Sequence, residues 1–130
     1  MSHLDDDPQP NGELSLQTVA MPRDTNANGD IFGGWLLSQM DIAAGVAAGK
    51  VANGRVATVA IDNMNFLVPV KVGSIVGCYT EIVSIGRSSI QVLVEVWINA
   101  GLSSQKTKVT EGLFVFVSID ETGHTRAVDQ

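Results

Sequence analysis

The sequence predicts an α+β domain in which an antiparallel sheet wraps around one long buried helix. Apolar residues lie on every side of the stretch from residue 31 to about residue 50, which is typical of a buried helix. From residue 55 onward the apolar positions alternate with a period of two, as in half-buried strands. Short links join these later strands, so we expect them to run antiparallel, with the helix across the concave face of one sheet.

The elements are expected in the order strand, helix and four strands. Loose alternation predicts a first strand over residues 13–20. Residues 23–30 are dense in turn-forming residues and predict a loop, and Asp30 at its end is a suitable N-cap for the helix. The period-two segments predict four further strands, at residues 55–67, 74–85, 89–99 and 107–119.

The last two predicted strands carry apolar side chains on both faces. The expected core-facing sets are Ile90, Val92, Val94, Val96 and Ile98, followed by Leu113, Val115, Val117 and Ile119. The opposite faces carry Leu93, Trp97, Phe114 and Phe116. Because one helix cannot cover both sides of a five-stranded sheet, we expect an oligomer that buries the remainder.

Length and composition favour one folded domain. The chain has 130 residues, of which 45% are hydrophobic and 17% charged, so a disordered chain is excluded. Residues 1–12, which include Asp5, Asp6 and Asp7, are expected to form a disordered acidic tail, and residues 13–130 the domain. The net charge of −6 and the lack of a basic cluster argue against a nucleic-acid partner.

The sequence also bears on location. The first twelve residues lack the basic and apolar regions of a signal peptide. The longest apolar stretch, residues 31–49, contains Gln39 and Asp41, so we expect a buried helix and no stable membrane insertion. The single cysteine, Cys78, excludes an internal disulfide framework and favours a reduced, cytoplasmic compartment. Its place inside a predicted strand fits a small core residue better than a nucleophile.

Asp41 is the first candidate for chemistry. It is the only charged residue between Asp30 and Lys50, and its neighbours are apolar. Burying an unpaired carboxylate costs several kcal/mol, and the helix dipole helps only within the first turn. Hydrogen bonds, water or a bound proton must therefore compensate the charge. A carboxylate of this kind facing a cleft is a candidate general base; the alternatives are an anchor for a loop amide or a solvent-facing side chain.

Gly33 and Gly34 are the second candidate, because two glycines in the first helical turn leave backbone N–H groups approachable. Such a turn binds anions or a developing oxyanion; the alternative is close packing of the helix start against a strand. At about 1.5 Å per residue, Gly34 and Asp41 are roughly 10 Å apart along the axis. One reacting carbonyl needs both groups within about 3 Å, so a second subunit must supply one of them if both act.

Other polar positions are candidates for substrate contacts. Asn26 and Asn28 in the loop can orient a water or a carbonyl, or can form turns. The segment from Gly86 to Ser89 supplies a guanidinium, from Arg87, and two hydroxyls, from Ser88 and Ser89. These groups suit a phosphate; the alternative is an ordinary hairpin turn. Further candidates, which also fit strands or a solvated strand face, are Arg55, Thr58, Lys106 and Lys108.

Several chemistries lack support. His3 and His124 lie in terminal segments, and neither a Ser-His-Asp or Cys-His triad nor a metal-ligand spacing can be assembled. The glycines form neither a P-loop nor a GxGxxG motif. The chemistry still compatible with the sequence is hydrolysis or acyl chemistry that uses one carboxylate and backbone dipoles.

Residues 21–41, MPRDTNANGDIFGGWLLSQMD, closely resemble the YciA-type branch of the hotdog-fold acyl-CoA thioesterases. Three further segments are similar to this family: GRVATVAIDNMNFLVPVKVGSIV from residue 54, GRSSIQVLVEVW from residue 86 and TEGLFVFVSID from residue 110. The resemblance covers about residues 14–126. It implies a five-stranded antiparallel sheet around a central helix, assembled as a homodimer and often as a hexamer, a trimer of dimers.

The resemblance also implies roles for particular residues. Asp41 matches the family's catalytic aspartate, Asn26 an asparagine that works opposite it across the dimer, and Gly34 the glycine whose N–H polarises the thioester carbonyl. Arg87, Ser88 and Ser89 match the segment near the coenzyme A nucleotide and pantetheine arm. We count Gly33, Arg55, Thr58 and Gly86 as further coenzyme A contacts.

The resulting hypothesis is a cytoplasmic enzyme of fatty acid metabolism that hydrolyses acyl-CoA to free acid and coenzyme A. No separate cofactor is expected, because coenzyme A is part of the substrate and product. Asp41 would activate a water or attack the thioester directly. A hydratase on the same fold would need a His beside the carboxylate. A non-catalytic acyl-CoA sensor or carrier is the alternative from another class.

Overall fold

The computed structural model describes residues 8–99 and 101–128, so the predicted tail lies in part, at residues 1–7, outside the described residues. The chain folds into one helix and one sheet, and both were predicted. The elements are β1 (Glu13–Val19), η2 (Pro22–Asp24), α1 (Gly33–Ala52), β2 (Val56–Phe66), β3 (Ile75–Ile85), β4 (Ser89–Asn99) and β5 (Lys106–Ser118). Strand boundaries agree with the prediction to within one residue.

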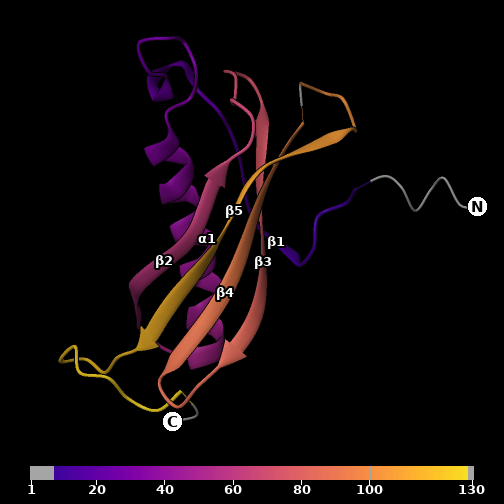
Figure 1. Ribbon diagram of the computed structural model, residues 1–130. Helices are drawn as coiled ribbons and strands as arrows, with labels where there is room; N and C mark the ends of the chain where they lie inside the picture. Colours follow the sequence, from indigo (N-terminus) through magenta and orange to yellow (C-terminus); the bar gives the residue numbers. More distant parts are fainter. Residues whose placement is uncertain (1–7, 100, 129–130) are drawn as a thin grey trace, which may run out of the picture.

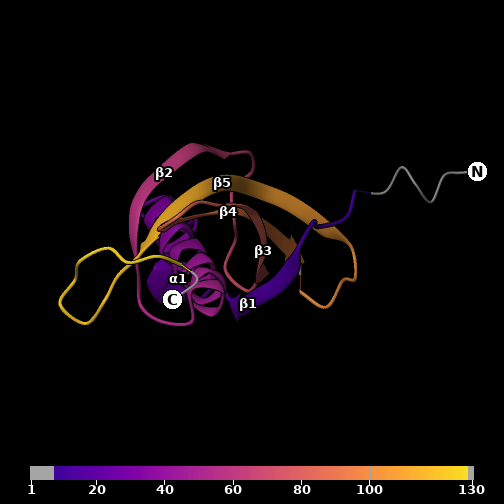
Figure 2. The same cartoon turned by 90° about the horizontal axis from the view of Figure 1, so that it is seen from below.

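The sheet has the strand order β1-β3-β4-β5-β2, and every neighbouring pair is antiparallel. Helix α1 connects β1 to β2 and therefore joins the two edges of the sheet. Figure 1 shows the helix lying along the strands, and Figure 2 shows the sheet curving around it. This confirms the α+β fold in which a sheet wraps around one helix.

The helix starts later than predicted. It begins at Gly33 with Phe32 as its N-cap, and the side chain of Asp30 does not cap it. Ile31 instead forms a β-bridge with Thr25 and donates its N–H to the carbonyl of Val70, 2.9 Å away. Asp30 pairs with Lys71. The prediction of an N-cap at Asp30 was wrong because these contacts hold residues 30–31 in extended backbone.

The core-facing side of β5 also differs from the prediction. Phe114 and Phe116 are fully or almost fully buried, whereas the expected set of Leu113, Val115 and Val117 is half-buried on the outer face. Both faces of β5 are apolar, so alternation alone could not choose between them. Pairing with β4 determines which face of β5 points to the core. Phe114 lies opposite Val92 and Phe116 opposite Ile90, and both partners belong to the predicted core set of β4.

The outer face of β4 carries a polar cluster formed by Asn11, Glu95, Trp97, Lys108 and Glu111. Trp97 was expected to be exposed in the monomer and buried by a partner subunit. It is only 4% exposed in the monomer, and it donates its indole N–H to Glu95 Oε1 at 2.8 Å. Asn11 N–H donates to the same carboxylate at 3.1 Å, and Lys108 pairs with Glu95 and Glu111. Burial would raise the pKa of Glu95, but these donors outweigh it and lower the pKa.

The exposed apolar residues lie mostly elsewhere. Edge strand β2 and the residue after it expose Val59, Ile61, Phe66 and Leu67, and the helix exposes Ile42 and Val46. Such an unpaired apolar edge is typical of an interface between subunits. No helix in the described part of the chain is long and apolar enough to span a membrane.

Candidate active site

Asp41 lies in the middle of α1, roughly two turns after the helix begins. Its side chain is half-buried on the side of the helix that faces β2. The hydroxyl of Thr58 donates a hydrogen bond to its Oδ1 at 2.7 Å. Among the described residues this is the one hydrogen bond to the carboxylate, so Oδ2 is left to accept a proton from a ligand or a water.

Thr58 was singled out as a coenzyme A contact, but its hydroxyl is already engaged with Asp41. The two residues are 17 positions apart and on different elements. A β-bulge between Thr58 and Ala60 interrupts the register of β2 against β5 next to this contact. Bulges of this kind re-aim side chains beside functional sites.

The first turn of α1 carries Gly33 and Gly34. Neither backbone N–H has an acceptor within the described chain, as expected for the first residues of a helix. A Cβ on Gly33 would lie 3.3 Å from the ring of Phe66, so this glycine packs closely against β2. Gly34 is exposed, and a Cβ there would meet only the ring of Phe32 at an ordinary 3.5 Å. The fold therefore does not require glycine at position 34.

Asn26 holds its own loop together. Its side-chain Oδ1 accepts the N–H groups of Asn28 at 2.9 Å and Asp30 at 3.2 Å, and its own N–H donates to the carbonyl of Asp30 at 2.7 Å. The structure therefore shows the turn-forming arrangement that was the alternative for this residue. Because Oδ1 is occupied, the exposed Nδ2 group is what the side chain can offer to a ligand, and it can only donate.

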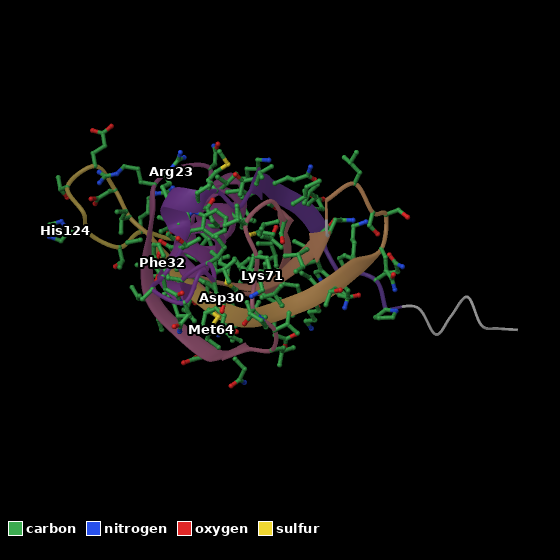
Figure 3. All side chains as sticks on the ribbon, turned by 90° about the horizontal axis from the view of Figure 1, so that it is seen from above. Arg23, Asp30, Phe32, Met64, Lys71 and His124 are labelled. Atoms are coloured by element: carbon green, nitrogen blue, oxygen red, sulfur yellow. The ribbon has the colours of Figure 1, made fainter. Side chains whose placement is uncertain are left out.

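One subunit does not bring these groups together. Gly34 and Asp41 lie on the same helix seven positions apart, which corresponds to roughly 10 Å along the axis. Asn26 and Asp30 belong to the loop that precedes the helix, which Figure 1 shows at the upper end of the molecule. Figure 3 labels Asp30 and its ion-pair partner Lys71 in a view from above. The carboxylate and the free N–H groups are thus two half-sites.

The segment Gly86, Arg87, Ser88 and Ser89 forms the β3–β4 turn at the opposite end of the molecule (Figure 1). Gly86 N–H donates to the Ser89 carbonyl at 2.8 Å, which closes the turn. The exposed Arg87 borders a small cavity of about 220 Å³ with Ile85 and Val128. Its guanidinium has no hydrogen-bond partner among the described residues, and its exposure and charge make it a candidate for an anion contact.

Arg55 is less available. Its Nη1 donates to the carbonyls of Asp120 and Glu121, at 3.3 and 3.1 Å, and so ties the start of β2 to the segment after β5. Arg126 has a similar structural role and donates to the carbonyl of Ala52 at the end of α1, at 2.8 Å. Of these arginines, Arg87 is the clearest candidate for a phosphate contact.

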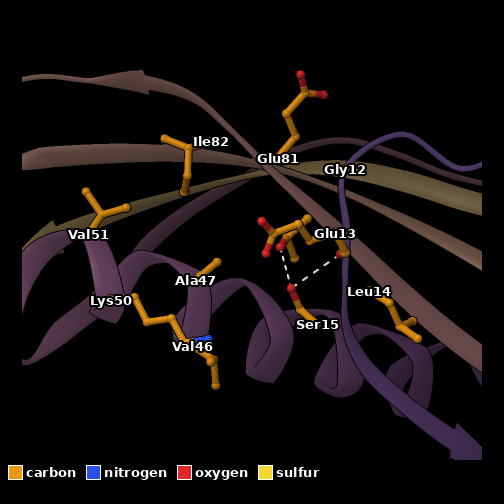
Figure 4. A pocket seen from close by; sticks show the side chains of 11 residues that line it. Gly12, Glu13, Leu14, Ser15, Val46, Ala47, Lys50, Val51, Glu81 and Ile82 are labelled. Atoms are coloured by element: carbon orange, nitrogen blue, oxygen red, sulfur yellow. Dashed lines mark hydrogen bonds between the residues drawn. The ribbon is translucent and has the colours of Figure 1, made fainter.

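Two other features lie away from these half-sites. Burial raises the pKa of the Cys78 thiol to about 12, which agrees with a core residue and not with a nucleophile. A cavity of about 460 Å³ lies between β1, β3 and the second half of α1, lined by Ser15, Lys50 and Ile82 among others (Figure 4). None of the candidate site residues lines this cavity.

Comparison with known proteins supports the fold and the class. The chain is 50% identical over 129 residues to the acyl-CoA thioester hydrolase YciA of Salmonella typhimurium, covering 97% of this chain and 96% of that protein. The hexameric thioesterase y2039 from Yersinia pestis is 52% identical with a TM-score of 0.88, over 92% of this chain and 97% of that one. The family model of the thioesterase superfamily matches residues 28–104.

A solved structure with lower sequence identity contains bound coenzyme A compounds. The acyl-CoA hydrolase from Staphylococcus aureus, in complex with butyryl coenzyme A, coenzyme A and coenzyme A disulfide, is 28% identical with a TM-score of 0.81. The similarity covers 86% of this chain and 68% of that chain. Structures of that enzyme with an asparagine, a threonine or an aspartate replaced by alanine superpose equally well, with TM-scores of 0.81, 0.80 and 0.80.

A sheet wrapped on one helix, with a carboxylate in the middle of the helix and free N–H groups at its start, defines a hotdog-fold thioesterase. Both solved structures share the fold of this chain, with TM-scores of 0.88 and 0.81. The chain belongs to the thioesterase superfamily, and it is identical to the YciA-type hydrolase at half of the aligned positions.

Proposed function

We propose that this protein hydrolyses acyl-CoA thioesters to a free carboxylic acid and coenzyme A. The observation that carries the proposal is the hydrogen bond between Thr58 and Asp41, which orients one carboxylate oxygen and leaves the other for a water or a thioester. The similarity to acyl-CoA hydrolases over nearly the whole chain supports this substrate class.

The proposed reaction needs a polarised carbonyl and a nucleophile. The N–H of Gly34 binds the carbonyl oxygen as negative charge develops on it. In the general-base route, Asp41 takes a proton from water while the water oxygen attacks the carbonyl carbon, and the coenzyme A thiolate leaves and is then protonated. In the covalent route, Asp41 attacks the same carbon, the thiolate leaves, and water hydrolyses the resulting anhydride. Neither route uses a separate cofactor.

The separation of the two half-sites supports a dimer as the active unit. Asp41 lies beside β2, whose outer edge is unpaired and apolar. Two copies that met along β2 would bring the helix start of one subunit, with Gly34 and Asn26, toward Asp41 of the other. Asn26 would then donate from its Nδ2 to the water or the carbonyl. The hexameric state of the relative from Yersinia pestis supports further assembly of such dimers.

The mutants of the Staphylococcus aureus hydrolase support this set of residues. The asparagine, aspartate and threonine that were replaced in that enzyme follow one another at separations of 15 and 17 residues. Asn26, Asp41 and Thr58 follow one another at the same separations in this chain. An asparagine, an aspartate and a threonine at this spacing are therefore proposed as the catalytic set here.

We propose Arg87, with the hydroxyls of Ser88 and Ser89, as the contact for coenzyme A phosphates, on a turn that the Gly86 N–H closes by its bond to the Ser89 carbonyl. The exposed guanidinium of Arg87, to which no other described residue hydrogen-bonds, supports this role. Gly33 and Arg55 are placed in supporting positions, because the first packs on Phe66 and the second is bonded to loop carbonyls.

The test is a thiol-release assay with purified protein and a panel of acyl-CoAs of increasing chain length. Steady release of coenzyme A is expected; binding of acyl-CoA without release would identify a sensor or carrier instead. A single turnover in isotope-labelled water separates the two routes. Label that first enters Asp41 would rule out the simple general-base route, and label that goes directly into the product acid would support it.

A further inference from the structure

Two half-exposed phenyl rings flank the first turn of α1. The ring of Phe66 lies 3.3 Å from the Cβ position of Gly33, and the ring of Phe32 lies 3.5 Å from that of Gly34. Phe32 is 42% exposed and Phe66 is 49% exposed, whereas the core rings of Phe114 and Phe116 are at most 2% exposed. The rings that are left uncovered are thus the ones next to the free N–H groups.

Both rings are held in place by backbone contacts. Phe32 is the N-cap of α1 and donates its N–H to the carbonyl of Asp24 at 3.1 Å. Phe66 ends β2 and pairs with Thr110 of β5, which is fully buried. Figure 3 labels Phe32, which lies where the helix begins, in a view from above. The backbone of both residues is therefore fixed, and their rings form an apolar surface beside the helix start.

We infer that Phe32 and Phe66 contact the acyl chain of the substrate and set its preferred length. This inference rests on the proposed function, because it assumes that Gly34 binds the thioester carbonyl. A carbonyl at that N–H carries two branches, the acyl chain and the pantetheine arm joined through sulfur. The pantetheine arm contains amides that need hydrogen-bond partners, and the two rings offer none. The hydrocarbon branch is the one that gains from contact with them.

The size of the effect follows from burial of methylene groups. Each methylene removed from water contributes about fourfold in binding or in kcat/KM. A chain of four additional methylenes that runs along both rings would therefore raise kcat/KM strongly over that of acetyl-CoA. Removal of one ring should cancel a substantial part of this preference.

The experiment measures kcat/KM for acetyl-, butyryl-, hexanoyl- and octanoyl-CoA with the wild type and with Phe66→Ala, Phe66→Leu and Phe32→Ala. The hexanoyl-to-acetyl ratio is expected to fall at least about tenfold in each alanine variant and by less in Phe66→Leu. Val83→Ala is the matched control, because Val83 is 46% exposed on β3, and its ratio should equal that of the wild type. If one alanine variant fails to fold, the hexanoyl-to-acetyl ratios of the remaining two variants still test whether the rings contact the acyl chain.

An unchanged ratio in folded variants would overturn the inference. If that unchanged ratio came with elution as a smaller species in size-exclusion chromatography, the rings would belong to a contact between copies instead. Failure of the proposed function gives a different result, since the wild type itself would then release no coenzyme A from any substrate.

Discussion

Thr58 on β2 donates its hydroxyl proton to Oδ1 of Asp41 on α1, with 2.7 Å between the two oxygens. This hydrogen bond compensates part of the cost of a half-buried carboxylate and fixes its rotamer. It also joins the helix to the strand whose outer edge is unpaired. The position of the carboxylate therefore depends on how α1 packs on β2, so small changes at either residue should lower the turnover rate.

Replacement of Asp41 by asparagine should lower turnover at least about 100-fold, because the amide can neither take a proton from water nor attack the thioester. The fold should be retained, since asparagine has the same size and can accept the Thr58 hydroxyl bond. Steady-state thiol release and circular dichroism measure the two effects. Glu81→Gln, at an exposed carboxylate on β3, is the control. Near-normal turnover in Asp41→Asn would remove this residue from the mechanism.

Replacement of Thr58 by valine should lower kcat about tenfold, because valine keeps the shape but removes the donor that orients Asp41. Serine at the same position keeps the hydroxyl and should restore most of the loss. KM should change less than kcat in both variants if the role is to position the carboxylate. A larger effect on KM than on kcat would instead favour the earlier interpretation of Thr58 as a coenzyme A contact.

Replacement of Phe114 by alanine should destabilise the protein by about 3–5 kcal/mol, because the ring is completely buried. Val115→Ala, on the half-buried outer face of the same strand, should cost clearly less. Chemical denaturation of both variants measures the difference. Equal losses would contradict the orientation of β5 in the structure.

The stability contributed by Glu95 should depend on pH. Hydrogen bonds from Trp97 and Asn11 and the charge of Lys108 outweigh burial and lower the pKa of Glu95 below its ordinary value of 4.5. A lowered folded-state pKa stabilises the protein above the unfolded-state value, and this contribution is lost as the pH falls through the folded-state value. Glu95→Gln should therefore be less stable than the wild type at pH 7, by about 2 kcal/mol.

The stability difference between Glu95→Gln and the wild type should shrink as the pH falls below about 4.5. Thermal unfolding between pH 3 and pH 7 tests this expectation. Glu121→Gln, at an exposed carboxylate, serves as the control for the general effect of removing one negative charge. A stability gap that stays constant over this range would show that Glu95 acts through packing and not through its charge.

The sequence predicted the elements well because each has a clear period. The strand at residues 89–99 alternates cleanly, and the helix is recognisable from its length and its apolar surface. The helix start was misplaced because Ile31 and Asp30 make contacts with residues 70 and 71, about 40 positions away. The β5 face was misassigned because both of its faces are apolar, and only pairing with β4 distinguishes them.

The candidate site was predictable residue by residue but not as an arrangement. Asp41 stood out as a lone charge in an apolar helix, and Gly34 as a glycine in the first turn. The bond from Thr58 to Asp41 could not be foreseen, because it depends on the packing of α1 against β2 and on a nearby bulge. Phe32 and Phe66 were missed because a phenylalanine beside a helix start gives no signal until its exposure is known.

The strand order has a consequence for how the chain folds during synthesis. Strand β2 ends at Phe66, yet β5, its one partner strand in the described part of the subunit, begins at Lys106. A nascent chain must therefore expose both edges of an apolar strand while about forty further residues leave the ribosome. Pairing that depends on such distant segments is slow, and free strand edges promote aggregation. Early chaperone contact or prompt completion of the last strand should thus govern the yield of folded protein in the cell.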